Sequence, residues 1–419
     1  MHPRRAIPAH AAAKLALVAI MLLLAACAAA PRREPLATLL APEQGEPLGL
    51  AGLRLYPERA EGAVTAAHAA AWPLPEAPRL RPPALPGPFD ELALSGGGDG
   101  GAFAVGVLTG WTQAGTRPSF GVVTGVSAGA LIAPFAFLGP DYDPVLREVA
   151  LSSGPDRFFK KRWPVAGLLG DGFSSSEPLK HLIATHVTAA VIGRVADEYR
   201  RGRDLYLMTT DLDAGTPVIW DMGAIAASGS PEALELFRQV MLASASVPGV
   251  VSPVFIDVSA GRRRYRELHV DGAVTHEVFA YPFSLQFPVA AADEPRPQRV
   301  FVIMNVKLEP GSERTAPRAL DIGSRAIQMM VETQARNDVE RLCETLPERG
   351  IPLELAYIDS SFRAPHPRAF DAAYMRKLFA YGRELGASGR AWHGLAPLEE
   401  PPPPRTPSEP RPMSASLQH

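Results

Sequence analysis

A run of glycines stands between two apolar segments in ELALSGGGDGGAFAVGVL, residues 91–108. Each glycine loses more conformational freedom on folding than any other residue does, so a folded chain needs a reason for the cluster. A flexible linker would not explain the apolar segments that press against both ends. The pattern predicts a buried strand, a loop of bare backbone and then a helix.

A second abrupt change from strand to helix follows in VVTGVSAGALIAPFAF. Gly125, Ser127 and Gly129 form a Gly-x-Ser-x-Gly motif between an expected strand, 119–124, and an apolar helix. This is the context of a nucleophile elbow, in which a sharp turn flanked by small residues lifts a serine hydroxyl clear of the backbone. The alternative is a tight turn without chemistry.

The glycine loop is a candidate oxyanion hole for that serine. Bare N–H groups near a helix start can stabilise an oxyanion, and Gly96, Gly97, Gly98 and Gly101 would form this loop. Gly96-x-Gly98-x-x-Gly101 also fits a dinucleotide-binding loop, which needs an acid about 20 residues later. No acid occurs at 100–140, which disfavours that alternative.

The base that would accept the serine proton is less clear from residue types alone. Histidines at 269, 276, 366 and 393 lie in segments that mark none of them. Asp271 lies in ELHVDGAVTHEV, where Asp-Gly between apolar residues also predicts a hairpin turn. A Ser–Asp pair and a Ser–His–Asp arrangement both stay open at this point.

Apolar strands alternate with helices over residues 86–395, which predicts one three-layer α/β/α domain with a mainly parallel central sheet. Expected strands are 91–95, 119–124, 204–212, 216–222, 299–306 and 353–359, and expected helices include 231–244, 321–346 and 370–386. Residues 396–419, which contain PPPP, are expected to be a disordered tail. The formal net charge of −2 gives no basic field for nucleic acid.

The N-terminus has the pattern of a bacterial lipoprotein signal. Basic residues precede the apolar run 15–26, which ends in LAAC at Cys27 and resembles a lipobox. We expect residues 1–26 to be removed, Cys27 to be lipidated, and residues 27–85 to be an Ala/Pro-rich tether, partly ordered toward its end. By the same resemblance, Ala28 favours the outer membrane of the cell envelope.

Four motifs in order resemble the patatin-like phospholipases: SGGGDGG (95–101), GVSAG (125–129), ASASVPGVVSPV (243–254) and DGA (271–273). The resemblance implies the patatin-like fold and hydrolysis of lipid acyl esters through an acyl-enzyme, without metal or cofactor. It implies Ser127 as nucleophile, Asp271 as base within the motif completed by Gly272 and Ala273, and the glycine loop as oxyanion hole. Substrates would be membrane lipids or other acyl esters.

One position departs from the family pattern. The family commonly carries Arg or Lys where this chain has Gly100. The backbone donors of the loop are kept, but a cation that could contact a phosphate is missing. A different kind of protein, a lipoprotein that only binds lipids or partners on the same fold, is the alternative to an enzyme.

Overall fold

The computed structural model describes residues 35–57, 88–151, 174–280, 297–309 and 315–395, together with residues 156, 158, 160 and 161. The expected signal segment, Cys27 and the expected tail lie outside these residues, and the domain boundaries stay predictions. Among the described residues, no helix is both long and apolar enough to cross a bilayer.

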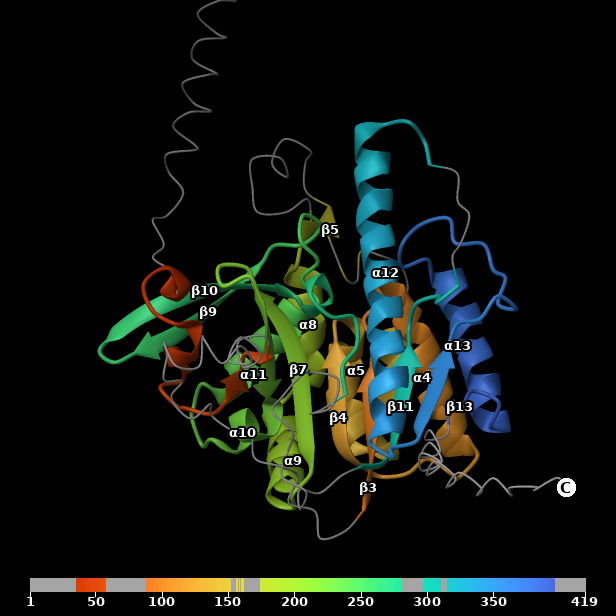
Figure 1. Ribbon diagram of the computed structural model, residues 1–419, viewed down its shortest axis with the longest axis horizontal. Helices are drawn as coiled ribbons and strands as arrows, with labels where there is room; N and C mark the ends of the chain where they lie inside the picture. Colours follow the sequence, from red (N-terminus) through yellow and green to blue (C-terminus); the bar gives the residue numbers. More distant parts are fainter. Residues whose placement is uncertain are drawn as a thin grey trace, which may run out of the picture.

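One large sheet organises the described chain, with strand order β1-β9-β10-β7-β4-β3-β11-β12-β13 and β2 joined through β8 to β7 (Figure 1). Its strands are β1 (Glu46–Pro47), β2 (Arg54–Leu55), β3 (Phe89–Leu94), β4 (Phe120–Val126), β7 (Asp204–Asp211), β8 (Thr216–Asp221), β9 (Val254–Ala260), β10 (Arg263–Asp271), β11 (Pro297–Met304), β12 (Leu353–Tyr357) and β13 (His393–Leu395). A separate two-stranded sheet pairs β5 (Lys160–Lys161) with β6 (Ser174–Ser175).

The five central strands β7, β4, β3, β11 and β12 are parallel, and the remaining pairs are antiparallel. All six expected strands are present within a few residues of their expected bounds. The α/β class and the parallel centre of the sheet are therefore confirmed. The antiparallel hairpin β9–β10 is an element that the sequence pattern did not predict.

Helices cover both faces of this sheet. The helices are α4 (Gly101–Gln113), α5 (Ala128–Leu138), α6 (Asp143–Ala150), α8 (Glu177–His186), α9 (Ala189–Arg200), α10 (Met222–Ala227), α11 (Ala233–Ser244), α12 (Ala319–Glu348) and α13 (Ala372–Ser388). Short 3-10 turns are η1 (Leu36–Thr38), η2 (Pro42–Gln44), η4 (Gly98–Gly100), η5 (Pro140–Tyr142) and η7 (Gly272–Val274). The main core includes α4, α5, α11 and α13 with Leu92 and Leu94, whereas α12 packs with Ala93 in a second core. Alternate residues of β3 thus serve opposite layers, as the strand period requires.

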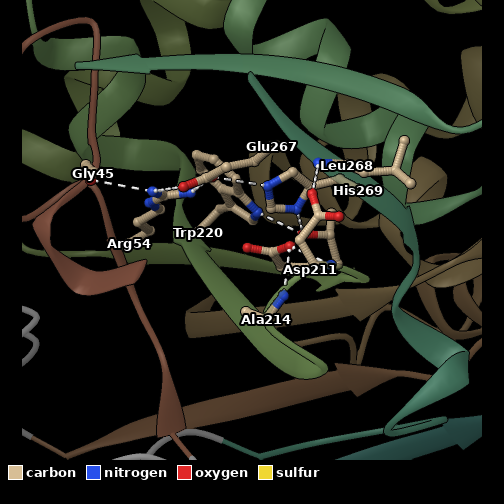
Figure 2. Close-up of polar contacts among 10 residues, drawn as sticks. Gly45, Arg54, Asp211, Ala214, Trp220, Glu267, Leu268 and His269 are labelled. Carbon is tan, nitrogen blue, oxygen red and sulfur yellow. Dashed lines mark hydrogen bonds and ion pairs between the residues drawn. The ribbon is translucent and has the colours of Figure 1, made fainter. Parts of the chain in front are cut away.

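Residues 35–57, here called the N-terminal strap, pack on the antiparallel end of the sheet. β1 pairs with β9, and β2 pairs with β8. The buried guanidinium of Arg54 pairs with both carboxylate oxygens of Glu267 and donates to the carbonyl of Gly45 at 3.1 Å (Figure 2). The charge of Arg54 holds the pKa of Glu267 down to about 2, although burial alone would raise it.

The network around Glu267 extends through His269 to β7. His269 Nε2 lies 3.2 Å from Glu267, and its Nδ1 lies 3.0 Å from Thr209 Oγ1, which accepts from Trp220 at 2.8 Å. Asp211, Glu267 and His269 have the composition of a metal site. However, Arg54 already neutralises Glu267 and both ring nitrogens of His269 have partners, so the network serves to fasten the strap to β10.

Candidate active site

Ser127 occupies the sharp turn between β4 and α5. Its φ of 51° and ψ of −118° are unusual for a residue with a side chain, and such strain is concentrated at functional sites. A Cβ on Gly125 would lie 2.7 Å from the carbonyl oxygen of Gly129, and one on Gly129 would lie 2.2 Å from that of Leu94. The turn therefore requires glycine at both positions, as the motif predicts.

Asp271 ends β10 and faces the serine. Ser127 Oγ donates a hydrogen bond of 2.6 Å to Asp271 Oδ2, and both side chains are buried. The other carboxylate oxygen accepts from the backbone N–H of Ala273 at 2.9 Å, and Gly272 begins the 3-10 turn η7. Asp271-Gly272 is therefore not a hairpin turn, contrary to that alternative; the hairpin closes at Gly261 instead.

Burial sets the protonation behaviour of Asp271. Desolvation raises the pKa of its carboxyl to about 7, against the lowering effect of the hydrogen bonds from Ser127 and Ala273. A carboxylate with an ordinary pKa is a weak base, whereas one near 7 is matched to accepting a proton at neutral pH. The pair therefore combines a hydroxyl with a base of suitable strength.

The histidines occupy other places. His269 belongs to the strap network, His366 Nε2 lies 2.7 Å from Asp99, and the ring of His393 packs beside Tyr357. His276 is buried, and its pKa is lowered to about 4 by desolvation and by Arg341. Within the described chain, none of the four bonds to Ser127 Oγ, which disfavours the Ser–His–Asp arrangement.

The glycine loop follows β3, whose neighbour β4 ends at Ser127, so both loops lie at the carboxyl edge of adjacent parallel strands. Gly97 and Gly98 have φ of 120° and 58°, which favour glycine. Among the described residues, no acceptor is present for the N–H of Gly97 or Gly98. These two N–H groups are free to bind an oxyanion.

Two glycines of the predicted oxyanion loop have a different role. The N–H of Gly96 donates to the carbonyl of Glu277 at 3.0 Å, and the N–H of Gly101 donates within the 3-10 turn. A Cβ on Gly101 would lie 3.3 Å from the Cβ of Ala128. Gly96 and Gly101 therefore shape the loop and hold it against α5, while Gly97 and Gly98 keep the free donors.

Asn305, directly after β11, fastens the loop and was not foreseen from the sequence. Its side chain donates to the carbonyl of Ser95 at 2.9 Å and accepts from the N–H of Ala104 at 3.2 Å. Its N–H donates to Ser95 Oγ at 2.8 Å. A Cβ on Gly100 would lie only 1.9 Å from the carbonyl oxygen of Asn305, so the loop in this packing has no room for a side chain there.

The opposite side of the loop is held through Asp99. Asp99 Oδ2 accepts from the N–H of Phe370 at 2.7 Å and lies the same distance from His366. The ring of Phe370 ends 3.8 Å from the position of a Cβ on Gly98. The segment before α13 therefore borders the two free N–H groups.

Ser244 and Glu277 complete the surroundings of the pair. Ser244 Oγ accepts from the N–H of Ser127 at 3.0 Å and donates to the carbonyl of Met208 at 2.6 Å, so the ASAS segment touches the elbow. The carboxyl of Glu277 is fully buried, without a hydrogen-bond partner in the described chain. Burial and the nearby Asp271 and Asp338 raise its pKa well above the ordinary value.

The segment that contains these loops resembles a known family. Residues 92–283 match the family model of the patatin-like phospholipases. They form a patatin-like domain. This match supports assignment of the domain as a lipid-hydrolysing esterase. The matched range includes all four motifs identified in the sequence.

The chain also resembles two solved structures at low sequence identity. VipD from Legionella pneumophila has 12% identity and a TM-score of 0.37, over 74% of this chain and 68% of that chain. The type III effector ExoU has 13% identity and a TM-score of 0.29, over 74% of this chain and 56% of that chain. No curated protein matches the chain.

Proposed function

We propose that this protein is a lipid acyl hydrolase of the phospholipase A or lysophospholipase type, with Ser127 as nucleophile and Asp271 as its base. The observation that carries the proposal is the 2.6 Å hydrogen bond from Ser127 Oγ to Asp271, made at a strained turn. The raised pKa of Asp271, to about 7, supports its role as base.

The reaction would proceed in two halves. Ionised Asp271 accepts the Ser127 proton as Oγ attacks the ester carbonyl, and the N–H groups of Gly97 and Gly98 stabilise the oxyanion. The carboxyl then gives its proton to the departing alcohol, which leaves an acyl-enzyme. Asp271 then takes a proton from the water that attacks the acyl-enzyme, and gives this proton to Ser127 Oγ as the bond to the fatty acid breaks.

The test uses a set of short-chain and phospholipid esters with Ser127→Ala and Asp271→Asn. Both variants are expected to lose hydrolysis by about 10⁴-fold while keeping the fold, since the two residues act as a unit. A fluorophosphonate probe should label Ser127 of the parent protein, which a merely lipid-binding lipoprotein would not allow. Full activity in Ser127→Ala would refute the assignment.

A second variant separates the two possible bases. His276→Gln is expected to keep ester hydrolysis, because His276 makes no hydrogen bond to Ser127 in the described part of the chain. Loss of activity in this variant together with activity in Asp271→Asn would make a histidine the base.

We propose in addition that the protein is anchored in the bacterial cell envelope, at the outer membrane, by acyl chains on Cys27. The apolar run before LAAC supports this, and several acyl chains would exceed what stable anchoring requires. Incorporation of a labelled fatty acid in the cell, lost in Cys27→Ser, is the expected result. Equal labelling of both proteins would exclude this anchor.

A further inference from the structure

The hairpin β9–β10 projects past the body of the sheet. β10 pairs with β7 only at His269–Asp271, whereas it pairs with β9 from Arg263 to His269. Residues 263–268 therefore extend beyond Asp211, the last residue of β7. One end of β10 carries Asp271, and the other end forms a protruding tip (Figure 1).

The tip of this hairpin is basic. Arg262, Arg263 and Arg264 are exposed, and none of them makes an ion pair with another described residue. Arg266 is exposed as well, but it pairs with Asp257 at 3.2 Å. In a chain with a net charge of −2, these consecutive arginines, which have no ion-pair partner among the described residues, form a local positive patch on a protruding turn. We call residues 262–264 the arginine tip.

The N-terminal strap begins beside the same hairpin. β1 pairs Glu46 with Ser259 and Pro47 with Val258, next to the tip, and Leu36 packs near Glu267 of β10. Eight residues separate Cys27 from Leu36, a length of about 30 Å at full extension. Two of these eight residues are arginines, Arg32 and Arg33. A membrane anchor at Cys27 would therefore keep the hairpin within a short distance of the bilayer.

From this placement we propose that the arginine tip is a docking surface for an anionic lipid bilayer. Arginines at such a surface bind the phosphates of headgroups, and each cation adds to the attraction. Docking at the tip would orient a domain whose catalytic carboxylate lies at the other end of the same strand. The orientation depends on the proposed anchor, but binding by the tip does not depend on the proposed hydrolysis.

The test measures binding and not activity. The protein without residues 1–26, the apolar segment expected to be removed, and with Cys27→Ser, so that it cannot be lipidated, is floated with vesicles of phosphatidylcholine alone or with phosphatidylglycerol added, at low and high salt. The double variant Arg262→Glu with Arg264→Glu is compared with a matched control, Arg376→Glu with Lys377→Glu. The control residues are exposed on α13, at the opposite end of the sheet (Figure 1).

The tip variant is expected to bind vesicles containing phosphatidylglycerol about tenfold more weakly at low salt, because each arginine contributes appreciably near an anionic surface. Its binding to neutral vesicles and its melting temperature should stay unchanged, and the control should bind like the parent. High salt should remove the difference. Equal weakening in the control would overturn the proposal, as would unchanged binding of the tip variant. A change of oligomeric state by light scattering, without loss of vesicle binding, would make the tip a contact between copies instead.

Discussion

The substitution Gly100→Ala tests whether packing at Asn305 sets the position of the oxyanion donors. A Cβ at residue 100 would lie 1.9 Å from the carbonyl oxygen of Asn305, whereas real Cβ atoms stay at least 3.0 Å from such atoms. The loop or Asn305 must therefore move by about 1 Å. Displacing catalytic groups by that distance can cost about 100-fold in rate.

The measurement is kcat and KM for a soluble ester, with the melting temperature recorded in parallel. We expect kcat to fall by about 100-fold with little change in KM, since in the proposed mechanism the N–H groups of Gly97 and Gly98 stabilise the developing oxyanion. The fold should lose about 1–3 kcal/mol, the usual cost of overpacking. The rate of fluorophosphonate labelling should fall with kcat.

Two further variants serve as a control and as a larger perturbation of the same position. Gly193→Ala lies in α9, where an added Cβ meets nothing within 4 Å, so it should keep full activity and gain about 0.5–1 kcal/mol. Gly100→Arg restores the residue type common in the family and should be at least as inactive as Gly100→Ala. An active Gly100→Ala with a kcat within about twofold of the parent would refute the reasoning.

The remaining predictions concern buried charges. The proposed base Asp271 has to be ionised to accept a proton, and its pKa is raised to about 7, so kcat/KM should rise with pH and level off above about 7. A profile that is flat from pH 5 to 8 would contradict this. Because this pKa is raised in the folded state, the folded protein loses stability as the pH rises from about 4 through 7. Asp271→Asn should therefore melt at a higher temperature than the parent at pH 8, and the difference in melting temperature should disappear at pH 4. Arg54→Ala leaves Glu267 buried without its partner and should cost about 3–5 kcal/mol in denaturant unfolding, and Arg54→Met combined with Glu267→Leu should recover much of this loss; an unaffected single variant would mean that the strap adds little. Glu277→Gln should keep melting temperature and kcat close to the parent values, because burial raises the pKa of this carboxyl and favours its neutral form, which Gln resembles. A large loss in this variant would show that the charge of Glu277 is needed.

Local pattern was sufficient to predict much of this fold. The strands β3 and β4 and the turns after them were readable because apolar runs ended abruptly in glycine, and only glycine fits the positions of Gly125 and Gly129. The family resemblance carried by four motifs in order also implied that Ser127 and Asp271 belong together, although they are 144 positions apart. Their catalytic roles remain proposals.

The local sequence pattern does not indicate contacts between segments that are far apart in the chain. The pair Arg54–Glu267 joins residues 213 positions apart, and Asn305 reaches Ser95 over 210 positions, with no local periodicity to indicate either contact. The sequence also did not indicate that the N–H of Gly96 is already bonded, because its acceptor is the carbonyl of the distant residue Glu277. Backbone partners supplied by another segment cannot be read from the motif alone.

The close packing of α4 against α13 is a further example. Cβ atoms on Gly106 and Gly110 would lie 2.3 and 2.1 Å from carbonyl oxygens of α13, and one on Gly386 would lie 2.3 Å from the carbonyl of Val107. These glycines allow two helix backbones to touch. The apolar pattern of neither helix predicts this close contact between their backbones.

The contacts that hold the glycine loop determine which truncated forms of the protein can keep it in place. Asn305 and Phe370, which hold the loop from two sides, both follow residue 283, where the family match stops. An expression product trimmed to 92–283 would also lack β11, the strand that separates β3 from β12. A working fragment therefore has to run through α13, and truncations that end near 283 should yield protein whose oxyanion loop has lost its supports.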